Sequence, residues 1–136
     1  MDIFDKGSYD STVTDVFNRQ SFCRTQVDSK KYRSYVKKMP SLIQVNGLGQ
    51  TLAFYFSKID EKVEGRIYGE IYRTVATWLK RQFPEQFRES TEEDHQLIKT
   101  VINLGSRDYR TFAMETLALL NWMRKFVDGL VTSDEA

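Results

Sequence analysis

The sequence predicts an all-α protein, a single compact bundle of five to six helices in one domain over residues 1–136. Apolar residues recur with the 3.6-residue period of an amphipathic helix along most of the chain, and no segment alternates long enough for a strand. A chain of 136 residues with 40% hydrophobic content is the size of one domain with one core. Two prolines and seven glycines argue against a loop-rich β protein or a disordered chain.

The two ends of the chain have the weakest helical pattern. Residues 1–10 mix Asp, Gly and Ser, and residues 131–136 are polar and acidic, so both are expected to be flexible ends. A first helix is indicated by four apolar residues, Val13, Val16, Phe17 and Phe22.

The next helix has one apolar stripe, formed by Tyr32, Tyr35, Val36 and Met39. Pro40 is expected to end this helix or to kink it sharply, because proline lacks the backbone N–H that a helix interior requires. A short second piece then contains Leu42, Ile43 and Val45 and reaches Asn46-Gly47.

Three stronger helical patterns follow. The first has the apolar spacing of an amphipathic helix and contains Leu48, Leu52, Tyr55, Phe56 and Ile59. The second stops at Phe83-Pro84 and contains Ile67, Ile71, Tyr72, Val75, Trp78 and Leu79. The third begins at a capping box over residues 90–94 and contains Leu97, Ile98, Val101 and Ile102.

Gly105 is expected to cap the end of that third helix, and Ser106 to cap the start of the last one. One face of the last helix is formed by Tyr109, Phe112, Ala113, Thr116, Leu120, Met123 and Phe126.

The residues that catalysis or metal binding would need are scarce. Cys23 is the only cysteine, so no disulfide can form within the chain, and a buried thiol near an apolar stripe is favoured over a reactive one. His95 is the only histidine, and it sits in an acidic first helical turn, where solvation or capping is the favoured role. One His and one Cys cannot complete an ordinary zinc shell. We therefore predict no catalytic residue, no metal site and no cofactor.

Two acidic runs leave a magnesium-dependent nuclease open as a third hypothesis. Asp60-Glu61-Glu64 and Glu92-Glu93-Asp94 lie at expected helix ends, where they complement the helix dipole. A nuclease would need such carboxylates to converge from separate helices. Gly47-Leu48-Gly49 is a helix break with close packing rather than a phosphate loop, since no strand precedes it and no Gly-Lys-Ser/Thr follows.

The chain also lacks the patterns of membrane and secreted proteins. No uninterrupted apolar run approaches 18 residues, and the acidic start of the chain is unlike a secretory signal. With a single cysteine, these features indicate a cytoplasmic protein without a membrane partner.

Charge is segregated along a chain whose net charge is only +1. Residues 19–38 contain seven cations against Asp28 alone, and residues 65–82 contain four cations against Glu70 alone. Helical spacing aligns these cations in two stripes, Lys30–Arg33–Lys37 and Arg66–Arg73–Lys80. Such stripes can follow a phosphate backbone. The alternative is a solvated face whose cations pair with the chain's own acidic segments.

Two blocks resemble the small subunit of the type III-B Cmr complex, an RNA-guided CRISPR effector. The first runs from Tyr32 to Phe54 and reads YRSYVKKMPSLIQVNGLGQTLAF. The second runs from Glu115 to Phe126 and reads ETLALLNWMRKF, with Tyr109-Arg110 upstream. Their order and spacing cover most of residues 32–126, whereas residues 1–28 have no quotable similarity.

The resemblance implies a non-catalytic subunit in antiviral defence, without a small-molecule substrate. Its partners are then the other Cmr subunits, copies of itself stacked in a filament, and the guide RNA–target RNA duplex. We expect the RNA contacts to come from Arg33, Lys37, Lys38, Arg73, Lys80, Arg81, Arg124 and Lys125. Gln44, Asn46 and Gln50 could cap helices or hydrogen-bond to sugar and phosphate. Packing or subunit contact is expected of Tyr35, Leu42, Ile43, Leu48, Leu52, Phe56, Trp78, Leu117, Leu120 and Trp122.

The alternative from another class is a free-standing helical regulator that binds nucleic acid. Gly105-Ser106 joins two helices as tightly as a helix-turn-helix motif does. However, Tyr109, Phe112 and Leu120 leave little polar surface for a recognition helix.

Overall fold

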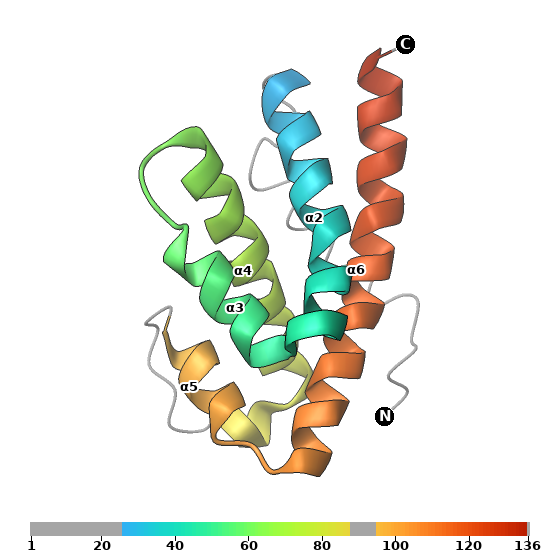
Figure 1. Cartoon of the computed structure of the whole chain (residues 1–136). Coiled ribbons are helices and arrows are strands. Elements are labelled where there is room, and N and C mark those ends of the chain that lie inside the picture. The colour runs from blue at the N-terminus through green and yellow to red at the C-terminus, as the bar shows by residue number, and fades with distance from the viewer. Residues whose placement is uncertain (1–25, 88–94, 136) are drawn as a thin grey trace.

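The structure, a computed structural model, describes residues 26–87 and 95–135 (Figure 1). The described residues are almost entirely helical and contain no strand, which confirms the all-α prediction. The elements are α2 (Gln26–Asn46), α3 (Leu48–Ser57), α4 (Val63–Gln82), the 3-10 helix η1 (Pro84–Phe87), α5 (Gln96–Ile102) and α6 (Ser106–Glu135). The predicted first helix, Cys23, the capping box and Glu92-Glu93 lie outside the described residues.

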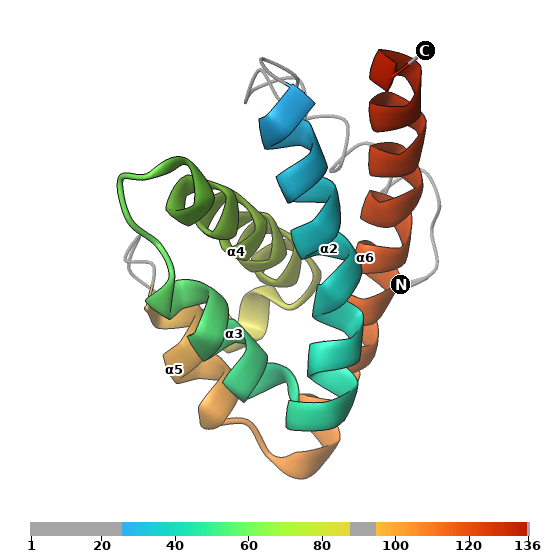
Figure 2. The ribbon, with the colours of Figure 1, turned by 45° about the horizontal axis from the view of Figure 1, so that its top comes forward.

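Two long helices, α2 and α6, run antiparallel and side by side (Figures 1 and 2). The helices α3 and α4 both pack against α2, α4 also contacts α6, and α5 lies against α3 and the start of α6. No helix among the described residues is long and apolar enough to cross a membrane.

The core lies where α2, α4 and α6 meet. Tyr32, Val36, Met39 and Ile43 are all buried, and they form one stripe along α2. Trp78 of α4 is buried, and its indole N–H donates a hydrogen bond of 2.8 Å to Oε1 of buried Glu115 on α6. All ten residues that we expected to pack belong to the buried core or lie partly buried against it.

Pro40 does not end α2. The helix continues to Asn46, so the predicted second piece with Leu42 and Ile43 belongs to the same helix. Proline inside a helix costs about 3 kcal/mol through a lost hydrogen bond and a steric clash. The apolar stripe crosses this position unbroken, because Met39 and Ile43 are buried on either side of it. Tertiary packing therefore outweighs the local cost.

The corner between α2 and α3 is built around Gly47, the only described glycine with a positive φ (87°). Its carbonyl oxygen accepts a hydrogen bond of 2.9 Å from the Thr51 hydroxyl. The Tyr109 hydroxyl from α6 reaches into the corner and accepts a 2.9 Å hydrogen bond from the Gly49 N–H. The predicted helix break with close packing is confirmed.

The boundaries of α5 and α6 differ from the predictions. Asn103 rather than Gly105 caps α5, and its side-chain amide donates to the Lys99 carbonyl at 2.9 Å. The Gly105 carbonyl instead accepts the Tyr109 N–H at the start of α6. Ser106 is therefore the first residue of α6 rather than its cap.

Three further details of these two helices correct or refine the predictions. Ile102 is 64% exposed, so it does not belong to the buried stripe of α5. His95 stands at the N-cap position of α5, but its side chain makes no capping hydrogen bond. α6 extends to Glu135, so residues 131–135 are helical where a polar tail was expected.

Candidate nucleic-acid interface

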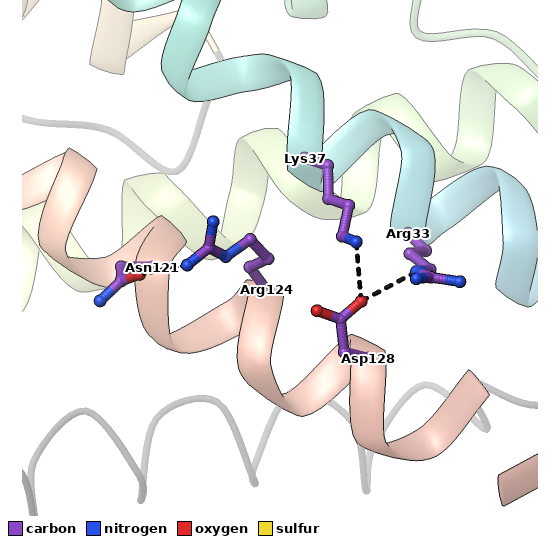
Figure 3. A network of polar contacts seen from close by, with 5 residues as sticks. All are labelled: Arg33, Lys37, Asn121, Arg124 and Asp128. Atoms are coloured by element: carbon purple, nitrogen blue, oxygen red, sulfur yellow. Dashed lines mark hydrogen bonds and ion pairs between the residues drawn. The ribbon is translucent and has the colours of Figure 1, made fainter. Parts of the chain in front are cut away.

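A cluster of cations lies where the second half of α6 packs against α2 (Figure 3). Arg33 Nε and Lys37 Nζ each lie 2.9 Å from the same atom, Oδ1 of Asp128. Arg124 lies one turn before Asp128 on α6 and hydrogen-bonds to Asn121 at 3.1 Å. Two cations thus share one carboxylate and a third lies one helical turn away, so the cluster keeps a net positive charge.

Asp128 responds electrostatically to these neighbours. The pKa of its carboxyl lies below the ordinary value of 3.8, chiefly because of its hydrogen bond from Lys37 and secondarily because of Arg33. The carboxyl therefore stays ionised at neutral pH and holds Arg33 and Lys37 at the helix seam.

The cluster continues along the solvent side of α6. Arg107, Arg110 and Lys125 are exposed on the same third of the helix surface as Arg124. At 1.5 Å per residue, Arg110 and Arg124 are about 21 Å apart along the axis. Lys125 Nζ also lies 4.9 Å from the centre of the Trp122 ring. We call these six residues, Arg33, Lys37, Arg107, Arg110, Arg124 and Lys125, the α2–α6 basic face.

Sequence reasoning missed Arg107 and Arg110 as members of this face. Their spacing could have indicated this, because positions 110 and 124 are about four helical turns apart and therefore lie on the same side of the helix. The sequence prediction took only Arg124 and Lys125 from this helix.

Lys38 is directed away from Lys37, its neighbour in sequence. Its Nζ donates a hydrogen bond of 2.6 Å to the Tyr68 hydroxyl on α4. The same atom lies 4.5 Å from the ring centre of Tyr35, 4.9 Å from that of Tyr68 and 5.6 Å from that of Phe54. Lys38 therefore serves an intramolecular cation–π contact, and the structure separates it from the α2–α6 basic face.

The second predicted stripe lies on another side of the molecule. Glu64 and Tyr68 of α4 contact α2, through an ion pair with Lys31 at 2.9 Å and a hydrogen bond from Lys38. Half a helical turn away, Arg66 and Arg73 are exposed. Lys80 is partly buried and Arg81 exposed farther along α4. The stripe Arg66–Arg73–Lys80 on α4 therefore faces away from α2 and does not merge with the α2–α6 basic face.

The acidic run Asp60-Glu61-Glu64 lies at the start of α4. Asp60 Oδ1 accepts a hydrogen bond of 2.9 Å from the Lys62 N–H just before α4 begins. Asp60 also packs against Gly65, where an added Cβ would lie 1.9 Å from Oδ1. Among residues 26–87 and 95–135, no three His, Cys, Asp or Glu side chains form a group that could hold a metal ion.

Comparison with known protein families identifies the chain. The family model described as CRISPR-associated protein (Cas_Cmr5) matches residues 11–130. The match covers most of the 136 residues and contains both blocks noted in the sequence. The chain therefore belongs to the Cas_Cmr5 family of CRISPR-associated proteins, the small subunit of the type III-B Cmr complex.

Proposed function

We propose that this protein is a non-catalytic structural subunit that uses the α2–α6 basic face to contact RNA within a cytoplasmic Cmr complex. The RNA is the guide–target duplex held during antiviral defence. The observation that carries this proposal is the convergence of Arg33, Lys37 and Arg124 at one seam between two helices. Membership of the family supports the association with other Cmr subunits.

The geometry suits backbone contact rather than base recognition. Cations spread over about 21 Å of one helix can meet several phosphates, and each neutralised phosphate releases counterions. If about four phosphates of the duplex are neutralised, the logarithm of affinity falls with the logarithm of salt with a slope of about −3.6. With a net charge of +1, the isolated chain has little general attraction for RNA. The basic face is therefore a contribution to a groove that several subunits share.

Copies of the chain are proposed to stack in a filament. Exposed apolar side chains near the α2–α3 corner support a contact between subunits there. Val45 is 82% exposed at the end of α2, and Ile102, which is 64% exposed, lies beside Gly49. Val45→Ser with Ile102→Ser should weaken self-association, as measured by sedimentation of the full chain over a concentration series. Unchanged sedimentation would exclude this end of the bundle as the contact.

The RNA contact is tested by reversing charges that hold no part of the fold together. Arg110→Glu with Arg124→Glu leaves the Asp128 ion pairs intact, and Lys38 is kept because its reversal would disturb the aromatic contacts. In the assembled complex, affinity for target RNA should fall, and the salt slope should shrink by about 1 for each lost contact. Lys99→Glu, at an exposed position on α5, is the matched control.

Equal affinity and salt slope for the double variant and wild type would overturn the assignment of this face. Circular dichroism of the variants checks that helicity is retained. Incubation of the purified chain with target RNA tests the non-catalytic role, and cleavage that disappears on chelation would contradict it.

A further inference from the structure

The helices α2 and α3 diverge from the Gly47 corner (Figure 1). A groove lies between the second half of α2 and α3. Its volume is about 340 Å³, near the lower end of the range for small-molecule sites. The lining residues are Leu42, Asn46, Gln50, Thr51 and Phe54. The groove is a different surface from the α2–α6 basic face, because Lys38, on its flank of α2, points away from α6.

The groove has a polar inner end. Asn46 and Gln50 flank the Gly47 corner, and both are exposed to solvent. Neither side-chain amide is hydrogen-bonded to another residue that the structure describes. Each amide can donate and accept, as Asn and Gln do when they bind the edge of adenine. An aliphatic occupant would offer these amides no hydrogen bond in exchange for the water that it displaces.

The outer end of the groove offers an exposed aromatic ring with lysine ammonium groups over it. Phe54 is 39% exposed, although it packs edge to face against Tyr68. Lys58 Nζ lies 5.4 Å from the centre of the Phe54 ring, and Lys38 Nζ lies 5.6 Å from it. Lys58 is exposed, so its ammonium group can move off the ring. The ring is then a stacking surface for a base, and the Lys58 ammonium matches the phosphate.

We propose that this groove binds one unpaired nucleotide of an RNA strand. The base would stack on Phe54 and hydrogen-bond with Asn46 and Gln50, and the phosphate would lie toward Lys58. The nucleotide must be unpaired, because pairing in a duplex occupies the base edge that the amides require. The volume of about 340 Å³ suits a ligand of about the size of one nucleotide. The RNA source of this ligand rests on the proposed function, whereas the chemistry of the groove does not.

The direct test uses the full chain and a free nucleotide. In ¹H–¹⁵N spectra, adenosine 5′-monophosphate at about 10 mM should shift the side-chain signals of Asn46 and Gln50 and the Gly49 N–H, as expected for a millimolar site. Ribose 5-phosphate, which has the same sugar and phosphate but no base, should leave them in place. No shift, or an equal shift with ribose 5-phosphate, overturns the proposal.

Variants assign the response to the groove. Asn46→Ala with Gln50→Ala should weaken nucleotide binding about fivefold or more, the scale of about 1 kcal/mol per good base contact. Gln44→Ala removes an exposed amide from the same helix outside the groove, so binding should be unchanged. Equal effects of the double variant and the control contradict the assignment.

The same variants separate this proposal from the proposed function. In the assembled complex, the Asn46/Gln50 variant should lose affinity for a target with one unpaired nucleotide and keep its affinity for a fully paired target. Reversal of the charges of Arg110 and Arg124 should weaken the affinity for both targets. If that reversal has no effect but the free nucleotide binds, the proposed function fails and the groove stands. If the two targets respond alike to the Asn46/Gln50 variant, the groove is not a site for an RNA base.

Discussion

Gly47→Ala is expected to destabilise the protein, because two separate features at this corner require glycine. The backbone there has φ 87° and ψ 162°, a region that is almost restricted to glycine. An added Cβ would also lie 2.9 Å from the Tyr109 hydroxyl, closer than van der Waals contact allows. The substitution therefore strains the chain and displaces the side chain that ties α6 to the start of α3.

The size of the loss follows from these two features. The backbone conformation costs about 1–3 kcal/mol for a residue with a Cβ. Displacing Tyr109 breaks its hydrogen bond with the Gly49 N–H, which is worth about 0.5–1.5 kcal/mol. Together they predict that the free energy of unfolding falls by about 1.5–4.5 kcal/mol.

Urea denaturation followed by tryptophan fluorescence measures the decrease in the free energy of unfolding, and two comparisons isolate its causes. In the Tyr109→Phe background the hydroxyl is gone, and the next ring atom, Cζ, is 4.0 Å from the new Cβ. The decrease in the free energy of unfolding caused by Gly47→Ala should then be smaller by about 1 kcal/mol, and the remainder is the strain of the backbone at position 47.

Gly49→Ala is the matched control for this prediction. Its Cβ would make contacts of 3.6 Å or longer, and its φ is ordinary, so stability should be unchanged or higher by up to about 1 kcal/mol. Equal unfolding free energies for the Gly47 and Gly49 variants would refute the account of the corner.

Three further predictions concern packing and charge. Gly65→Ala should lower stability by about 1–3 kcal/mol, since its Cβ would lie 2.5 Å from the backbone nitrogen of Asp60; a urea midpoint equal to wild type would contradict this. Glu115→Ala should cost about 1–3 kcal/mol by removing the acceptor of the buried Trp78 N–H, whereas Glu115→Gln should cost less by calorimetry. The folded-state pKa of Asp128 is lowered, so its stabilisation is present above pH 3.8 and is lost as pH falls through the lower value. Wild type should therefore lose more stability than Asp128→Asn in urea titrations from about pH 5 downward.

Periodicity predicted most of the fold because one side of each long helix is buried. The apolar spacing located α3, α4 and α6, and the ten expected packing residues are in or against the core. Sequence rules for helix ends failed where contacts with distant residues decide whether the helix continues. Pro40 stays helical because its neighbours in the stripe are buried, and Gly105 takes no left-handed conformation because Asn103 already caps α5.

The candidate interface was less predictable, since the sequence does not say where a charged side chain points. Lys37 and Lys38 are adjacent in sequence, yet one meets Asp128 on α6 and the other meets three aromatic rings on α2, α3 and α4. A charge count treats them alike. Likewise, Arg33 and Arg124 are far apart in the chain, and only the antiparallel pairing of α2 and α6 brings them to one seam.

The shared contact with Asp128 also bears on the entropy of binding. A free arginine or lysine side chain carries about 2 kcal/mol of rotamer entropy, which it loses when a ligand fixes it. Arg33 and Lys37 are already restrained by one carboxylate oxygen before any phosphate arrives. The seam is thus preorganised, and an incoming phosphate meets side chains whose ordering was completed during folding. The carboxylate lowers the local positive charge. It also lowers the conformational entropy that Arg33 and Lys37 lose when they bind a phosphate.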